Sequence, residues 1–171
     1  PNDPATIQGL IDTKEHRKAC GYVNHPLDPG GETKFGVAKN SNRDVNITTL
    51  DLAGAKKIFF DKYWTSTKSD KMPTLLNALF FDMAVISGQG AASKVLQRAL
   101  GVVDDGAIGP QTLKSLNSNQ NINALCSKYL DCRQDFFNNL ITKKPDLSVF
   151  KTGWNARITM LRKWLVANSK V

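Results

Sequence analysis

The sequence contains few cysteines and no long apolar run. Three cysteines among 171 residues cannot all pair. Cys126 and Cys132 stand six positions apart on one predicted helix and face away from each other, so we expect all three thiols to be reduced. The longest apolar stretch, residues 78–86, is broken by Asp82 and is far shorter than the roughly 18 to 20 residues that cross a bilayer. We expect no membrane span.

Histidine is equally scarce. The spacing of His16 and His25 fits no zinc pattern, even with Cys20 or Asp28 as a further ligand. We interpret both as ordinary surface histidines. The sequence therefore predicts no metal site, and we expect no organic cofactor.

The composition is that of an ordinary globular domain, with 41% hydrophobic and 22% charged residues. This excludes a disordered or collagen-like chain. Charge is unevenly distributed: residues 107–171 hold ten basic and three acidic residues, whereas residues 1–106 hold thirteen and twelve. A cationic C-terminal third attracts polyanions such as nucleic acid, anionic lipid or an anionic cell-wall polymer. Charge alone does not choose between them.

Apolar residues recur at helical spacing through most of the chain. The predicted helices cover residues 6–18, 49–64, 74–87, 91–100, 111–116, 122–140 and 150–168. Thr49 is the predicted cap of the second helix. Residues 21–42 are rich in Gly, Pro and Asn, which predicts a loop or short hairpin. We therefore predict a mainly α bundle with one irregular lobe after its first helix, where a functional site is expected.

The loop places groups capable of acid–base chemistry on a tightly turned backbone. Asp28 lies between Pro26 and Pro29, which stiffen the chain on both sides. The Gly30-Gly31 pair permits a close turn, and Glu32 and Thr33 follow it directly. Two interpretations remain open for Asp28: a carboxylate held for chemistry, or one that only caps a turn.

The stretch from Gly21 to Gly36 resembles the signature of the glycoside hydrolase family 108 muramidases. In that family a helix ends in Glu-Gly-Gly-Tyr, and the loop reads Val-Asn-x-Pro-x-Asp-Pro-Gly-Gly-Glu-Thr-x-Phe/Tyr-Gly. The likeness extends over essentially the whole chain, and the second half resembles the helical peptidoglycan-binding region of these enzymes. Further matching elements are Tyr63-Trp64, Phe81-Asp82-x-Ala84-Val85, Leu96–Gly101, Asp105-Gly106-x-Ile108-Gly109-Pro110-x-Thr112-Leu113 and Gly153-Trp154-x-x-Arg157.

The resemblance implies a phage or bacterial lysin that cleaves the bond between N-acetylmuramic acid and N-acetylglucosamine in peptidoglycan. It implies a lysozyme-like fold with a muramidase lobe at residues 1–88 and a peptidoglycan-binding lobe at residues 89–171, packed as one compact monomer. Synthesis in the bacterial cytoplasm, from a phage or prophage gene, and action in the periplasm or cell wall are expected. The N-terminal Pro1–Pro4 stretch has no signal-peptide pattern.

The resemblance also implies roles for particular residues. Such hydrolysis needs a protonated carboxylic acid and a second polar group on the other face of the sugar. Asp28 would position water or stabilise charge, and Thr33 would orient the water. The predicted substrate-binding residues are Tyr22, Asn24, Glu32, Trp64 and Asp82. Two of them have structural alternatives: Trp64 as a core residue, and Asp82 as a carboxylate bonded to neighbouring backbone or a tyrosine.

The acid itself is missing from the sequence. Ala19 occupies the position of the family's glutamate, and alanine has no proton to donate. One general acid typically contributes ~10²- to 10⁴-fold to the rate, so we expect little or no hydrolysis. Three explanations remain: deliberate replacement, natural loss accompanied by further departures at Cys20 and Ile86, and substitution by Glu15, one helical turn earlier.

Two other functions compete with an active muramidase. One is a lysozyme-shaped protein that binds peptidoglycan, or has an interaction role, without cleaving it. The other is a nucleic-acid-binding helical domain, which would use cations such as Arg157, Arg162 and Lys163 on the last predicted helix. That function leaves the Gly21 to Gly36 loop unexplained. We therefore expect peptidoglycan strands and the anionic wall surface as partners, and no nucleic acid.

Overall fold

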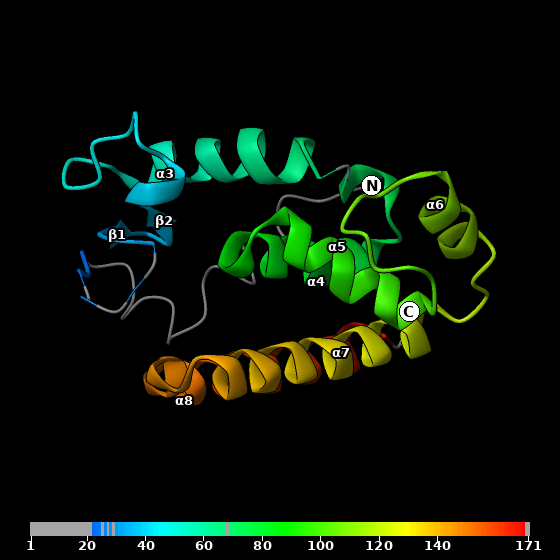
Figure 1. The fold of residues 1–171 in the computed structure, drawn as a ribbon. Helices are drawn as coiled ribbons and strands as arrows, with labels where there is room; N and C mark the ends of the chain where they lie inside the picture. The colour runs from blue at the N-terminus through cyan, green and yellow to red at the C-terminus, as the bar shows by residue number, and fades with distance from the viewer. Residues whose placement is uncertain (1–21, 25, 27, 29, 68, 170–171) are drawn as a thin grey trace. The chain divides into compact units, whose positions relative to one another are not determined.

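The computed structural model describes residues 22–24, 26, 28, 30–67 and 69–169, and its elements are shown in Figure 1. The chain divides into two compact units, with the boundary between Ser66 and Thr67. The described residues form helices and one small two-stranded sheet, which confirms the predicted mainly α, lysozyme-like class. The predicted first helix, residues 6–18, lies outside the described residues, as do Ala19 and Cys20.

The first unit contains the predicted hairpin. Its strands are β1 (Thr33–Lys34) and β2 (Val37–Ala38), paired antiparallel. Phe35 and Gly36 form the two-residue turn, with φ angles of 52° and 79°. Two consecutive positive φ angles are characteristic of a type I′ turn, whose twist suits the flanking strands. On its other side, Thr33 forms an isolated antiparallel bridge with Val23.

A helix follows the hairpin and changes its winding along its length. It comprises α3 (Leu52–Ile58) and the π-helical η2 (Phe59–Thr65). The predicted cap at Thr49 is wrong. Asp51 caps the helix instead, because its carboxylate accepts a hydrogen bond from the Gly54 N–H at 2.7 Å.

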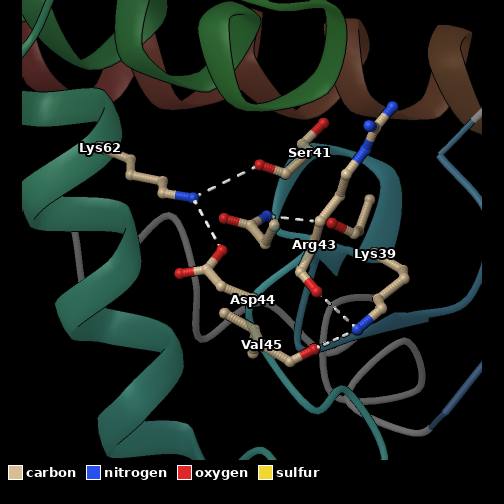
Figure 2. A network of polar contacts seen from close by, with 8 residues as sticks. Lys39, Ser41, Arg43, Asp44, Val45 and Lys62 are labelled. Carbon is tan, nitrogen blue, oxygen red and sulfur yellow. Dashed lines mark hydrogen bonds and ion pairs between the residues drawn. The ribbon is translucent and has the colours of Figure 1, made fainter.

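Two lysines fix the loop between the hairpin and α3 (Figure 2). The loop begins with the short 3-10 helix η1 (Lys39–Ser41). Lys39 Nζ donates to the main-chain oxygens of Arg43 and Val45 at 3.0 and 2.7 Å. Lys62, from η2, lies 3.7 Å from the Asp44 carboxylate. These contacts hold an otherwise irregular segment against the helix.

The second unit is built around one helix that is buried on nearly every side. Its elements are η3 (Ser69–Lys71), α4 (Thr74–Ser87), α5 (Gln89–Leu100), α6 (Pro110–Asn117), α7 (Ile122–Lys143), η4 (Pro145–Phe150) and α8 (Lys151–Asn168). Every residue of α4 from Leu76 to Ala84 is buried. The helix packs against α5, α7 and α8, which explains why its sequence is apolar around its whole circumference. Its predicted bounds, between Pro73 and Gly88, are confirmed.

The long helices α7 and α8 lie along each other (Figure 1). Phe137 and Trp154 stack between them, with ring centroids 4.5 Å apart and planes 15° apart. Cys126 and Cys132 both lie on α7 as free thiols, as predicted. No helix in the described part of the chain combines the length and hydropathy that a membrane crossing requires.

The spatial division differs from the division predicted along the sequence. The sequence places a boundary near residue 88, whereas the compact units meet at Ser66 and Thr67. The helix α4 lies between these positions and packs with α5 and α7. The functional division at residue 88 stays a prediction, and α4 physically forms the core of the second unit.

Candidate functional site

Asp28 is held by the turn that follows it. Its Oδ1 accepts a hydrogen bond from the Gly30 N–H at 2.7 Å, and its main-chain oxygen accepts one from the Gly31 N–H at 3.0 Å. The half-buried carboxylate therefore caps a turn, one of the two interpretations left open by the sequence. The same bonds fix the carboxylate in one place, as a reacting carboxylate requires.

The glycine pair is needed for this geometry. A Cβ on Gly30 would lie 2.9 Å from the Ala38 Cβ and 3.0 Å from Asp28 Oδ1. Gly31 has a φ of +70°, which L side chains rarely adopt. The turn can therefore lie against β2 only without side chains at these two positions.

Thr33 is attached to the same turn from the other end. Its Oγ1 donates to the Gly31 main-chain oxygen at 3.2 Å. Its own N–H and C=O bond to Val23, at 2.7 and 2.8 Å. The structure thus links Asp28 and Thr33 through one short turn: Asp28 begins the turn, and Thr33, in β1, bonds to Gly31 within it.

Three of the predicted substrate-binding residues also lie together. The Tyr22 hydroxyl donates to Glu32 Oε2 at 2.7 Å, and both side chains are accessible to solvent. This hydrogen bond, together with partial desolvation and the charge of Glu32, raises the pKa of Tyr22, while a hydrogen bond with Asn24 acts in the opposite direction. Tyr22, Asn24 and Glu32 therefore form an accessible polar cluster beside the bridge between Val23 and Thr33.

Trp64 does not share that accessibility. It is only 8% exposed, within the π-helical η2, where Phe59 is also buried. This burial supports the core interpretation of Trp64 over sugar stacking.

Asp82 is buried within the second unit and bonded to two arginines. Its Oδ2 lies 2.6 Å from Arg133 Nη1, and its Oδ1 accepts from Arg157 Nε at 2.8 Å and also from Arg157 Nη2. Burial alone would raise the pKa of Asp82, but the two guanidinium charges and their hydrogen bonds outweigh it, so the pKa is lowered. The partners are arginines and not the backbone or tyrosine expected from the sequence, and they favour a structural role.

Arg133 is the residue that the sequence reasoning missed. It is fully buried on α7 beside Tyr129 and Phe137, with its guanidinium 5.7 Å from the Phe137 ring. A signal was present: Cys126, Tyr129 and Phe137 mark a buried stripe at helical spacing, and Arg133 falls on it. An arginine on an apolar stripe requires a buried partner, and the carboxylate available in the apolar α4 segment was Asp82.

Part of the basic character of the C-terminal third is neutralised inside the second unit. Arg157 pairs with Asp82, and Arg162 Nη2 lies 2.6 Å from Asp131 Oδ1. Two of the three cations that suggested nucleic-acid binding therefore already have carboxylate partners. Lys163 remains exposed.

No group of three metal-ligating side chains clusters within the part of the chain that the structure describes. His16 and His25 lie outside that part. The described residues of the hairpin region offer a carboxylate, a hydroxyl and an accessible polar cluster.

This fold and hairpin define a class of protein. Residues 16–88 match the family model for glycosyl hydrolase 108, and residues 91–159 match that of a predicted peptidoglycan domain. The chain therefore combines a family 108 glycosyl hydrolase region with a peptidoglycan domain, which confirms the resemblance seen in the sequence. Peptidoglycan is accordingly its partner.

Among solved structures, the chain is similar to Brucella abortus SagA. The two share 28% sequence identity and a TM-score of 0.80, over 99% of this chain and 98% of that one. No curated protein sequence matches the chain.

Proposed function

We propose that this protein is a muramidase directed at the bond between N-acetylmuramic acid and N-acetylglucosamine, in a form that lacks its general acid. The observation that carries the proposal is the family 108 match across residues 16–88, with the Asp28 and Thr33 side chains both hydrogen-bonded to one glycine turn. The acid position in that region is Ala19.

The chemistry of the bond assigns the roles. Cleavage produces an oxocarbenium-like transition state and a leaving oxygen that must be protonated. Asp28 supplies the negative charge that stabilises the oxocarbenium-like transition state, or it positions water. Thr33 orients that water. Tyr22, Asn24 and Glu32 bind the sugar hydroxyl and acetamido groups. Ala19 cannot protonate the leaving oxygen, so the unmodified chain binds its substrate without turning it over at a useful rate.

Natural loss of the acid is the explanation we favour. Deliberate inactivation accounts for an alanine but not for Cys20 beside it, where the family has glycine, nor for Ile86, where the family often has asparagine. The protein then acts as a lysozyme-shaped binder of peptidoglycan. We place its synthesis in the bacterial cytoplasm, from a phage or prophage gene, and its action at the wall, where exposed lysines of the second unit add an attraction that weakens with salt.

Restoring the acid tests the proposal. Permeabilised Gram-negative cells are treated with the unmodified chain, with Ala19→Glu and with Ala19→Gln, which matches the glutamate in size but has no acidic proton. We expect turbidity to fall only with Ala19→Glu. Inertness of all three, with each folded, would overturn the muramidase assignment. Lysis by the unmodified chain that disappears in Glu15→Gln would show that Glu15 supplies the proton.

Binding is tested separately. The unmodified chain is sedimented with purified peptidoglycan freed of nucleic acid, alongside a DNA mobility-shift assay at two salt concentrations. We expect sedimentation with peptidoglycan and no specific DNA shift. DNA affinity that collapses with salt, without wall binding, would favour the nucleic-acid function instead.

A further inference from the structure

The second unit contains an open pocket lined by both polar and apolar side chains. It has a volume of about 490 Å³ and lies where the end of α5, the α6–α7 connection and the first turns of α7 meet. This volume falls within the range of small-molecule sites. All of its lining residues lie within residues 91–159, the region that matches the peptidoglycan domain.

The polar side of the pocket is formed by the connection between the helices. Asn119 Oδ1 accepts from the Asn121 N–H at 3.0 Å, and Asn121 Oδ1 accepts from the Ala124 N–H at 2.9 Å. These bonds fix the loop before any ligand arrives. Gln120 is exposed beside them, and its side chain forms no hydrogen bond with another described residue, so an amide donor and acceptor remain available.

One charge and an apolar floor complete the pocket. Lys128 projects from α7 one turn beyond Ala124, and its ammonium group forms no ion pair with any described carboxylate. The floor contains Ala99, Leu100 and Leu125. The site thus offers amide groups for a peptide bond, methyl-sized apolar surface, and one cation.

The chemistry of peptidoglycan narrows the ligand to one of its two components. Sugar rings in protein sites commonly stack on aromatic side chains, and none of the described residues that line this pocket is aromatic. The stem peptide carries small methyl side chains, peptide amides and a terminal carboxylate, which correspond to the apolar floor, the amide side chains and Lys128. We propose that this pocket binds the carboxylate end of a peptidoglycan stem peptide, an inference that rests on the proposed function of the chain.

The test titrates the full-length chain with N-acetyl-D-alanyl-D-alanine, with the same dipeptide as its C-terminal amide, and with a tetramer of N-acetylglucosamine. Backbone amide chemical shifts, followed by NMR during each titration, report both the binding site and the affinity. We expect saturable shifts centred on residues 118–128 with the free acid, and at least about tenfold weaker binding of the amide, because a charge-assisted hydrogen bond is lost. Shifts at 118–128 with the glycan but not with the dipeptide would overturn the proposal.

Three variants sharpen the result. Lys128→Gln should weaken binding of the free-acid dipeptide about tenfold or more and leave binding of the dipeptide amide unchanged. Lys143→Gln, at the other end of α7, makes the same charge change on an exposed residue and should alter the binding of neither dipeptide. Ala124→Phe fills the pocket from an exposed helical position and should abolish the shifts. Circular dichroism of each variant establishes that it is folded, and equal affinity of Lys128→Gln and the unmodified chain would overturn the proposal.

Sedimentation with whole peptidoglycan separates this inference from the function on which it rests. If the unmodified chain sediments but the dipeptide leaves residues 118–128 unshifted, the pocket assignment fails and the wall-binding function stands. If the chain does not sediment at all, both fail together.

Discussion

Arg133 Nη1 donates to Asp82 Oδ2 at 2.6 Å, joining α7 to α4 across 51 positions of sequence, and the two side chains are 0% and 3% exposed. Arg157 on α8 bonds to the other carboxylate oxygen. One aspartate therefore ties together three helices of the second unit. The cluster therefore fixes how α7 and α8 pack against α4.

Replacing Asp82 should destabilise the second unit severely. Asp82→Ala leaves two guanidinium groups without their carboxylate, one of them fully buried, and we expect a loss of about 3–5 kcal/mol in the free energy of unfolding. Urea denaturation measures it. The matched control is Asp131→Ala, which removes the exposed partner of Arg162 and should cost at most about 1 kcal/mol. Equal losses in the two variants would contradict a structural role for Asp82.

Acid should weaken the same cluster. The pKa of Asp82 in the folded protein lies below its ordinary value of 3.8, so the unfolded chain binds the proton more tightly. The stabilisation is then fully present above about pH 4 and declines as the pH falls through the lowered pKa. Thermal unfolding between pH 5 and pH 2 should show this decline in the unmodified protein, and a shallower one in Asp82→Asn. Parallel curves would exclude Asp82 as a source of acid sensitivity.

The two functions of Asp28 can be separated in the Ala19→Glu background. Asp28→Asn keeps an oxygen able to accept from the Gly30 N–H but removes the charge, whereas Asp28→Ala removes both. We expect both variants to lose lysis and only Asp28→Ala to lose protection of the Gly30 amide, because one hydrogen bond worth about 1 kcal/mol disappears. Lytic assays and amide hydrogen exchange measure the two effects. Full lysis by Asp28→Asn would show that Asp28 only caps the turn and that its charge is not needed for cleavage.

The hairpin turn is strained at its first position. Phe35 has a φ of 52°, whereas Asn-Gly is the preferred pair for a type I′ turn. Phe35→Asn should therefore stabilise the hairpin by about 1 kcal/mol. Gly36→Ala should destabilise it, because φ is +79° and the added Cβ would lie 3.3 Å from Phe59 Cζ. Hydrogen-exchange rates of the β1 and β2 amides measure the stability of the hairpin in both variants. If both variants stabilise the hairpin, or both destabilise it, the turn is not strained at Phe35.

The helices of this protein could be predicted wherever local signals agreed. Pro73 and Gly88 bracket α4, and Gly101 ends α5 in the left-handed conformation with a φ of 73°, as their chemistry requires. The cap of α3 was misassigned because Thr49 and Asp51 are both good capping residues, and the difference lay in which side chain reached a free N–H. The π-helical winding of η2 carried no local signal.

The candidate site divides in the same way. The glycine turn and the motif around Asp28 are contiguous, so their arrangement follows from local backbone preferences. Asp82 was a different case, because a carboxylate in an apolar helix is compatible with a cleft as well as with a buried ion pair. The choice depended on Arg133 and Arg157, which approach only when α7 and α8 pack against α4.

The amino-acid sequence by itself determined the mainly helical class, the hairpin after the first predicted helix, the resemblance to glycosyl hydrolase 108 and the absence of an acid at position 19, because each depends on residues close together in the chain. Only the tertiary structure decided that Asp82 binds two arginines, that Trp64 is buried and that the end of α5, the α6–α7 connection and the start of α7 line an open pocket. These features arise from side chains on separate helices, whose meeting is governed by packing of the whole unit and not by local preference.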